Sequence, residues 1–276
     1  MAEARVESGF RLRRGSGLSW LEVGGAGWRL AVSTREGGVS VGPYASLNLG
    51  FLVGDRSENV VANRRRLLAA LGIDPARLVV PHQVHGTVVR EVAADDGGCG
   101  ALDPTTAVGD CDALLTSAFD VALMVSVADC VPVFVAASAD GQASRIALIH
   151  AGWRGLAEGI VGAAARRTAR AAVLRAAAIG PSIGPCCFTV SEPVGQRFAA
   201  SWEGSYRDGR VDLWRVARLQ LEQAGIAPSA IVEARVCTMC DGRFFSHRCE
   251  GGLTGRQAAI AWMPAKGSSR KGGGVA

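Results

Sequence analysis

The stretch VALMVSVADCVPVFVAASADGQASRIALIHAGWRG, residues 121–155, decides the fold. It holds three short apolar runs, at 121–127, after Pro132 and at 145–149, and each has the length of a strand rather than of a helix. Uninterrupted apolar runs of this kind are typical of strands that are buried on both faces. The sequence therefore predicts a sheet at the centre of a layered fold.

The rest of the chain adds further strands and helices. Strands are expected at 27–33, 77–80, 87–92, 231–237 and 257–263, and helices at about 57–71 and 156–176. Ser57 is the expected N-cap of the first helix, and Gly72 is its expected C-terminal stop. This mixture predicts an α/β or α+β protein with layered sheets.

The first of these helices carries the densest basic run, Arg64, Arg65 and Arg66. Its apolar positions, such as Val60 and Leu68, share one face, so most of the basic run is expected on the solvated face. We expect no nucleic-acid-binding patch here. Arginines nevertheless dominate the basic residues of the chain, and their planar forks suit phosphate or carboxylate.

Composition indicates a substantial core and no membrane span. The 276 residues are 49% apolar, with a formal net charge of +5. No signal segment is visible, and no apolar stretch approaches the roughly 20 residues of a transmembrane helix. Eight cysteines in a chain of this length favour reduced thiols in the cytoplasm over a disulfide framework. One catalytic domain is expected at 1–263, with a loose N-terminal segment of about 15 residues and a disordered tail at 264–276.

Three metal-capable side chains stand in distinctive short motifs: His85 in PHQVHG, Cys130 in ADCVP and His150 in HAGWRG. Two imidazoles and one thiolate suit a zinc-like ion, and three protein ligands leave a fourth coordination position for chemistry. Cys130 and His150 follow predicted buried strands, whose carboxyl ends are where ligands collect in open α/β sheets. A single cysteine after an apolar strand is more often a core residue, so the prediction depends on all three.

Alternatives use neighbouring residues. His82 stands three residues before His85, but residues three apart in an extended chain face opposite sides, so His82 is expected to be an accessory. A structural zinc site is a further hypothesis, with three cysteines and one histidine as ligands: Cys237, Cys240, His247 and Cys249. Cys130 is also a candidate nucleophile, with His150 or His85 as its base.

The motifs together resemble one bacterial family over most of the chain. They are TREGGVS at 34–40, GPYASLNLG at 42–50, VGD at 53–55, NR at 63–64, QVHG at 83–86, DAL at 112–114, ADCVP at 128–132, HAGWRG at 150–155, GPSIGPCC at 180–187, FFSHR at 244–248 and TGR at 254–256. The family was long described as laccase-domain or polyphenol oxidase proteins. It is now regarded as purine nucleoside phosphorylases with adenosine deaminase activity, and some members are described as peptidoglycan-editing factors.

The resemblance implies an α+β fold, a single layered domain with mixed β-sheets packed between helices (α/β/β/α-like). It implies that His85, Cys130 and His150 are catalytic zinc ligands. The implied substrates are phosphate and adenosine, inosine, guanosine or S-methyl-5′-thioadenosine, with no nucleic-acid or membrane partner, in a monomer or homodimer. Relatives often carry histidine where this chain has Leu52, so any role of that imidazole is lost here.

The histidine count tests the laccase description. The chain has four histidines, whereas the copper sites of a multicopper oxidase need on the order of ten. Laccase chemistry is therefore excluded, and a single copper ion in the trio with incidental phenol oxidation stays an alternative to zinc. The competing class is a cysteine-dependent amide hydrolase that edits peptidoglycan.

Phosphorolysis also needs an anion site, and deamination needs an activated water and a proton donor. Arg154, at the turn that opens the second predicted helix, is the first candidate for phosphate. The other candidates are three arginines for phosphate, an asparagine for ribose or base, and an aspartate that acts as acid/base or supports a ligand: Arg35, Arg64, Arg248, Asn48 and Asp129. The usual zinc-deaminase signature is absent, so deamination would use a differently built site.

Overall fold

The predicted apolar strands build two six-stranded sheets. The computed structural model describes residues 9–264 except 140, 142 and 171. The first sheet has the order β1-β2-β3-β14-β7-β4, with the strands Arg11–Gly15, Leu18–Gly25, Trp28–Ser33, Gln257–Trp262, Ala122–Val127 and Leu78–Val79. The second has the order β13-β10-β8-β9-β6-β5, with the strands Ile231–Glu233, Val173–Ile179, Val131–Ser138, Arg145–Ala151, Ala113–Thr116 and Val89–Glu91.

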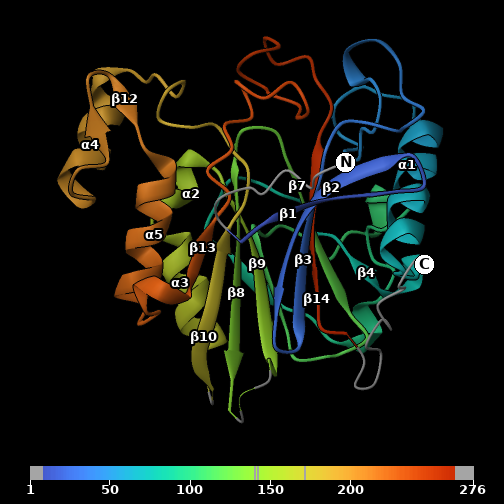
Figure 1. Cartoon of the computed structure of the whole chain (residues 1–276), viewed down its shortest axis with the longest axis horizontal. Helices are drawn as coiled ribbons and strands as arrows, with labels where there is room; N and C mark the ends of the chain where they lie inside the picture. The colour runs from blue at the N-terminus through green and yellow to red at the C-terminus, as the bar shows by residue number, and fades with distance from the viewer. Residues whose placement is uncertain (1–8, 140, 142, 171, 265–276) are drawn as a thin grey trace, which may run out of the picture.

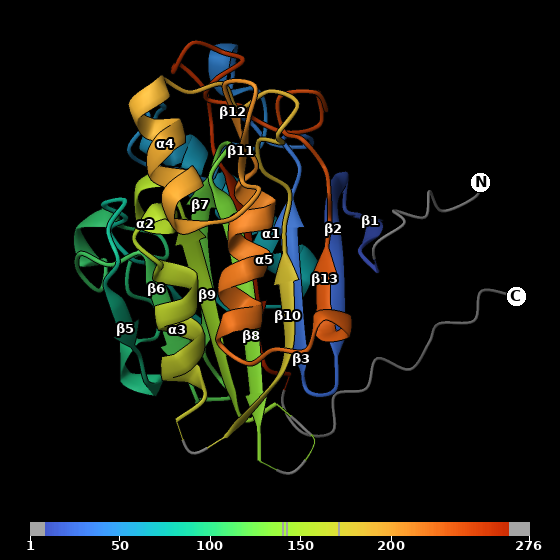
Figure 2. The same cartoon turned by 90° about the vertical axis from the view of Figure 1, so that its left-hand side faces the viewer.

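Helices cover the outer faces of both sheets. The α-helices of the described residues are α1 Ser57–Leu71, α2 Trp153–Ala157, α3 Ile160–Thr168, α4 Glu192–Ser201 and α5 Leu213–Gln223. Short 3-10 helices lie at Gly42–Tyr44, Pro75–Arg77, Ala94–Asp96, Pro104–Thr106 and Pro228–Ala230, and a small hairpin joins β11 Tyr206–Arg207 to β12 Arg210–Val211. In Figure 1, α1 flanks the first sheet on one side, and α2, α3 and α5 flank the second sheet on the other. Figure 2 shows α3 and α5 lying across the face of β8, β9 and β10.

The main core lies between the two sheets. Val32 and Val125 of the first sheet and Phe134 and Leu148 of the second are fully buried in one cluster. Phe134 stacks on Trp28 with 4.5 Å between ring centroids. Both sheets are mixed, because most neighbours are antiparallel while β4–β7, β5–β6 and β10–β13 are parallel. The predicted α+β fold with an α/β/β/α layering is confirmed.

The chain crosses from one sheet to the other at the ADCVP motif. β7 belongs to the first sheet and β8 to the second, so residues 128–130 span the gap between them. In the antiparallel pair β8–β9, Pro132 lies opposite His150 and Val131 opposite Ala151. This register places Cys130 beside the HAGWRG motif, although 20 residues separate the two in sequence.

The predicted helix at 156–176 is wrong. Gly159 adopts a left-handed conformation with φ +86° and separates α2 from α3, and α3 ends at Thr168. Residues 173–179 form β10, which pairs with β8 and β13. Pairing with two neighbouring strands outweighs the helix propensity of the alanines, which is only a fraction of a kcal/mol per residue. A one-turn α2 also weakens the expected helix-dipole contribution to anion binding.

Other expectations are met within a few residues. The helix at 57–71 is α1, and Gly72 is its left-handed C-cap, but Arg56 rather than Ser57 is the N-cap. The strand expected at 231–237 ends at Glu233. The predicted tail lies outside the described residues, apart from its first residue, and Arg11–Gly15 of the expected loose N-terminus forms β1. Among the described residues, no helix is both long and apolar enough to cross a membrane.

Arg64 is buried on α1, contrary to the expected solvated face. It lies four residues from both Val60 and Leu68, so helical periodicity turns it toward the core. Its Nε donates to the Leu49 carbonyl at 2.9 Å, and its Nη1 donates to the Gly100 and Ala101 carbonyls at 2.7 and 2.8 Å. Burial lowers the pKa of this guanidinium to about 9.

We expect Arg64→Ala to lower the free energy of unfolding by about 2–3 kcal/mol, because it leaves buried carbonyls without donors. The measurement is urea unfolding followed by circular dichroism. The matched control is Arg65→Ala, at an exposed neighbouring position, which should change the stability by less than about 0.5 kcal/mol. Equal stabilities of the two variants would contradict the structural role of Arg64.

Candidate metal and substrate site

The structure brings His85, Cys130 and His150 together at one edge of the two sheets. His85 lies in the segment between β4 and β5, Cys130 in the β7–β8 crossover and His150 near the end of β9. One ligand atom from each lies within 4.8 Å of the others, and His85 Nε2 is 3.8 Å from Cys130 Sγ. His85 is exposed, Cys130 half-buried and His150 buried, so the trio has an open side.

Asp112 holds both histidines in position through hydrogen bonds, and no role was predicted for it from the sequence. Its Oδ1 accepts hydrogen bonds from His150 Nδ1 at 2.8 Å and from the His85 backbone N–H at 2.9 Å. Its Oδ2 accepts the Gly86 N–H at 2.7 Å. Because the His150 Nδ1–H points at the carboxylate, its Nε2 lone pair is left for a metal ion. The backbone bonds hold His85 in a left-handed conformation, with φ +60°.

The charges within the trio favour a thiolate. Burial raises the pKa of Cys130, but His150 and the hydrogen bonds from both histidines lower it further, to about 6. Burial lowers the pKa of His150, but the Cys130 thiolate and Asp112 raise it to about 9. An ionised sulfur next to two imidazoles is a donor set that fits one zinc or copper ion.

Glycines let the HAGWRG turn approach the trio. A Cβ on Gly152 would lie 2.7 Å from His85 Cδ2 and 3.5 Å from Cys130 Sγ. A Cβ on Gly155 would lie 2.5 Å from the Gly86 carbonyl oxygen, which cannot move away as a side chain could. Both glycines are therefore required by close packing of this turn against the His85 segment.

The trio opens into a cavity of about 610 Å³, within the range of small-molecule sites. Its walls include apolar and aromatic side chains: Phe51, Leu52, Val80, Trp153, Ile183 and Phe188. Its cationic side chains are Arg64, Arg154, Arg248 and Arg256, and Asp129 is the carboxylate among the lining residues. The cavity thus combines flat apolar surfaces with an excess of positive charge.

Arg154 is free to bind an anion. Its guanidinium lies 4.6 Å from the Trp153 ring centroid, and among the described residues no hydrogen bond or ion pair occupies it. Arg248 lies over Phe188, and its Nη1 donates to the carbonyl and hydroxyl of Thr189 at 2.9 and 3.1 Å. Both arginines, which are candidates for phosphate binding, line the cavity.

Arg256 is a further cationic residue of the cavity lining, for which no individual role was predicted. Its Nη1 donates to the Thr254 and Gly255 carbonyls, at 3.0 and 2.9 Å. Burial lowers its pKa, while the negative charges of Cys130 and Asp129 act in the opposite direction. The TGR motif was the available signal, because it places an arginine directly before β14.

Asp129 holds the cavity wall. Its Oδ1 accepts the Thr238 hydroxyl at 2.6 Å, and its Oδ2 accepts the Arg248 backbone N–H at 2.7 Å. Its backbone has φ +79°. Since both carboxylate oxygens are engaged, the geometry favours positioning of the loops over proton transfer.

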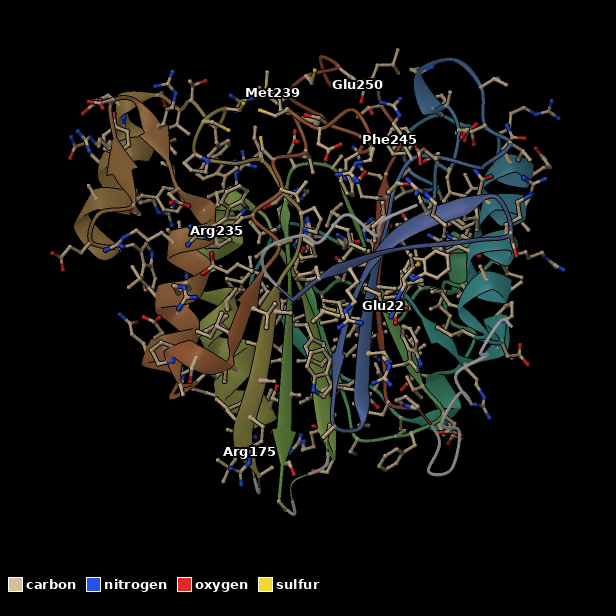
Figure 3. All side chains as sticks on the ribbon, in the orientation of Figure 1. Glu22, Arg175, Arg235, Met239, Phe245 and Glu250 are labelled. Carbon is tan, nitrogen blue, oxygen red and sulfur yellow. The ribbon has the colours of Figure 1, made fainter. Side chains whose placement is uncertain are left out.

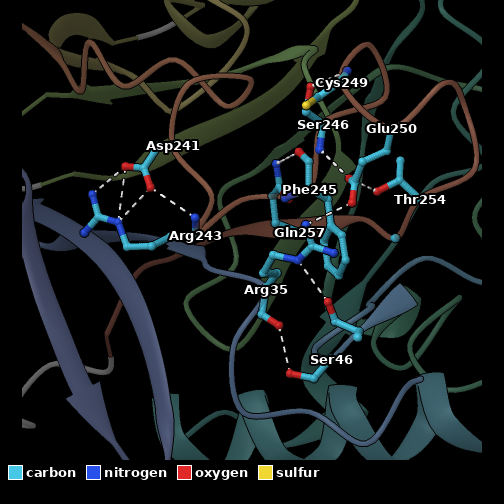
Figure 4. A network of polar contacts seen from close by, with 12 residues as sticks. Arg35, Ser46, Asp241, Arg243, Phe245, Ser246, Cys249, Glu250, Thr254 and Gln257 are labelled. Atoms are coloured by element: carbon cyan, nitrogen blue, oxygen red, sulfur yellow. Dashed lines mark hydrogen bonds and ion pairs between the residues drawn. The ribbon is translucent and has the colours of Figure 1, made fainter. Parts of the chain in front are cut away.

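Two substrate candidates lie outside the cavity lining. Arg35 stacks on Phe245 at 4.4 Å and forms an ion pair with Glu250 at 3.0 Å, inside the polar network of Figure 4. Asn48 is fully buried and bonds to Gly50 and Asp55 through its amide nitrogen, at 3.2 and 2.9 Å. Both shape the loops around the site, and the structure does not bring them to the trio. Arg64 reaches the lining, but carbonyls occupy its Nε and Nη1.

The remaining histidines are not members of the trio. His82 Nδ1 is 2.7 Å from Asp110 Oδ1, and His82 and His247 line the cavity. Leu52 is an exposed part of the same lining. The hypothesis of a structural zinc site formed by Cys237, Cys240, His247 and Cys249 is wrong in two of its ligands. His247 and Cys249 do not lie with the cysteines at 237 and 240. The site holds one open donor set, which does not fit a multicopper oxidase.

Comparison with known proteins gives consistent matches over most of the chain. A family model described as multi-copper polyphenol oxidoreductase laccase matches residues 29–264. The purine nucleoside phosphorylase YlmD of Geobacillus stearothermophilus is 41% identical over 258 residues, 87% of this chain and 93% of its own length. A purine nucleoside phosphorylase of Corynebacterium glutamicum is 36% identical over 248 residues, covering 86% of this chain and 94% of its own.

Solved structures share the fold. The crystal structure of YlmD from Geobacillus stearothermophilus superimposes with a TM-score of 0.85 and 38% identity, over 93% of this chain and 99% of the other. The hypothetical protein YfiH of Bacillus licheniformis gives a TM-score of 0.82 and 30% identity, over 91% and 98%.

Proposed function

The chain belongs to the family described as multi-copper polyphenol oxidoreductase laccase, and we propose that it is a zinc-dependent purine nucleoside phosphorylase. Its proposed substrates are adenosine, inosine, guanosine and S-methyl-5′-thioadenosine, with adenosine deaminase as a second activity in the cytoplasm. The open His85–Cys130–His150 trio at the edge of an arginine-bearing cavity carries the proposal. The names of the relatives support it.

In the proposed reaction a phosphate oxygen forms a bond to the anomeric carbon while the bond from that carbon to the purine nitrogen breaks. The electron pair leaves with the purine, which takes up a proton from water, and the products are the free base and the sugar 1-phosphate, which is ribose 1-phosphate when the substrate is adenosine, inosine or guanosine. Arg154, Arg248 and Arg256 would hold the phosphate, because charge-assisted bonds from arginine suit its oxygens. Phe51 and Phe188, each with one ring face covered by an arginine, offer apolar surface for the purine.

His85, Cys130 and His150 would hold the metal ion, for which zinc is proposed and copper is the alternative. When bound, such an ion supplies Lewis acidity and the activation of water. Asp112 would support both histidine ligands, through the Nδ1 of His150 and the backbone N–H of His85. In the deaminase reaction, water replaces the exocyclic amine of adenine and ammonia leaves, and no phosphate is consumed.

The test is an assay of adenosine turnover with and without phosphate, read by chromatography, together with metal analysis of the same protein. Phosphate-dependent adenine and ribose 1-phosphate would support the phosphorylase, and inosine formed without phosphate would support the deaminase. Copper found in place of zinc would show that the proposed identity of the metal ion is wrong. Absence of both products from a metal-loaded protein would overturn the proposal.

We expect Arg154→Ala to raise the KM for phosphate by about 10- to 100-fold, since a hydrogen bond to a charged group contributes about 1.5–3 kcal/mol. Metal content should stay unchanged, because Arg154 is not one of the three ligands. The control is Arg166→Ala, an exposed arginine on α3 that does not line this cavity. An unchanged KM for phosphate in Arg154→Ala would remove this residue from the anion site.

A cysteine hydrolase is the second candidate. Cys130 contacts His150, and His150 contacts Asp112, which is the nucleophile–base–acid arrangement that activates a thiolate. The two functions respond differently to reagents. A chelator should inactivate the phosphorylase, and zinc should protect Cys130 from iodoacetamide. A hydrolase should survive the chelator and be inactivated by iodoacetamide.

A further inference from the structure

Four cysteines gather at a second place, outside the cavity. Cys186 and Cys187 follow β10, and Cys237 and Cys240 follow β13. The four Sγ atoms lie within 4.8 Å of one another, with Cys187–Cys240 at 3.3 Å and Cys186–Cys240 at 3.8 Å. We call these residues the four-cysteine cluster.

The fold holds the two pairs in this position. β10 and β13 are parallel neighbours, so the loops after them leave the sheet at the same edge. A backbone bridge continues the pairing, since Ser182 N–H donates to Val236 O at 3.1 Å and Thr238 N–H donates to Ser182 O at 3.0 Å. Figure 3 shows Met239, inside the second loop, at the upper edge of the molecule.

The sulfur geometry suits one tetrahedral ion. With Zn–S bonds of about 2.3 Å, the four sulfurs of a tetrahedron lie about 3.8 Å apart, and the cluster spans similar distances. A disulfide would need two sulfurs at about 2.05 Å, and all the cysteines are free thiols. Gly184 N–H donates to Cys237 Sγ at 3.2 Å, a contact that stabilises a thiolate.

The cluster adjoins the wall of the substrate cavity. Ile183 and Phe188 flank the first cysteine pair in sequence and line the cavity. Thr238, within the second loop, donates its hydroxyl to Asp129, next to the ligand Cys130. Fastening the two loops together therefore fixes one side of the cavity.

We propose that Cys186, Cys187, Cys237 and Cys240 bind a single zinc ion, at a structural site separate from the His85–Cys130–His150 trio. A closed set of four thiolates leaves no coordination position for substrate, which is typical of structural rather than catalytic zinc. The ion would tie the β10 and β13 loops and so brace the cavity wall. This site does not depend on the phosphorylase function.

The test is zinc content per chain in protein purified under reducing conditions without chelator. The double variant Cys186→Ser/Cys240→Ser is expected to lose one zinc ion relative to the wild type. Cys130→Ala should keep that ion, whatever happens at the trio. Cys249→Ser is the matched control, because Cys249 is an exposed thiol on the neighbouring loop outside the cluster, and it should lose none. Equal zinc in the wild type and the double variant would overturn the proposal.

A second measurement covers the case in which the double variant does not fold. Demetallated Cys130→Ala protein, with the cluster intact, is titrated with cobalt(II), and thiolate-to-cobalt absorption is recorded. One equivalent with the spectrum of a tetrahedral all-thiolate site is the expected result. No such band would overturn the proposal, as would a disulfide within the cluster, found by mass spectrometry after alkylation without reductant. Iron in place of zinc in the purified protein would overturn the choice of ion.

Discussion

Replacing Cys130 by alanine is expected to lower adenosine turnover by at least about 100-fold and to remove the ion held by the trio. Mutation of a residue that only supports a metal ligand costs about 10- to 100-fold, so loss of a ligand should cost more. The remaining donors, His85 and His150, carry no negative charge when they bind metal, whereas the sulfur they face is ionised. The measurements are phosphate-dependent adenine release and zinc per chain.

His85→Ala should behave in the same way, because its Nε2 shares the site with Cys130 Sγ. The control is Cys99→Ala, a half-buried cysteine beside the main core that is outside both clusters. It should keep wild-type turnover and metal content. A Cys130→Ala protein that has lost the ion of the trio but keeps full activity would exclude metal-dependent catalysis at the trio.

The trio could be predicted because each member carries a local signal. The apolar runs at 121–127 and 145–149 became β7 and β9, and the metal-capable side chains stand where those strands end. Strand ends in neighbouring layers meet at one edge of the fold, so local motifs were enough to propose a site. The distances within the trio depend on the β8–β9 register, which the sequence does not show.

Contacts between distant segments were not predictable in the same way. Cys186 and Cys187 meet Cys237 and Cys240 only because β10 and β13 are parallel neighbours, and the helix predicted at 156–176 covered the first half of β10. For this reason the structural zinc site expected from the sequence had all its ligands in one stretch of chain, residues 237–249. The prediction for Arg64 failed for a different reason. It was assigned to the solvated face because of its charge, although its helical spacing places it with the apolar residues.

Asp112 is the clearest example of a residue whose role depends on tertiary structure. It precedes β6, whose Ala113 pairs with Ile149 of β9, and this pairing brings the carboxylate to His150. The backbone of the same residue adds a contact, since His150 N–H donates to Asp112 O at 2.7 Å. A short acidic motif before a strand gives no sign of these partners.

We expect Asp112→Asn to weaken zinc binding by about 10- to 100-fold and to lower the free energy of unfolding by about 3 kcal/mol. The carboxylate is fully buried and only accepts hydrogen bonds, from His150, His85 and Gly86. An asparagine would replace one acceptor oxygen by an NH₂ group that faces these donors. Either the His150 tautomer or a backbone N–H then loses its partner.

The control is Asp110→Asn, two residues earlier and largely exposed, whose carboxylate contacts His82 rather than the trio. It should keep both zinc affinity and stability within about 0.5 kcal/mol of the wild type. Zinc affinity is measured by competition with a chromophoric chelator, and stability by urea unfolding of the zinc-free proteins. Removing zinc from the stability measurement separates the lost hydrogen bonds from the lost ion, because bound metal itself stabilises the fold. If Asp112→Asn bound zinc as tightly as Asp110→Asn, the carboxylate would be a fold contact alone, and the trio would be oriented by the register of β9 and the close packing of Gly152.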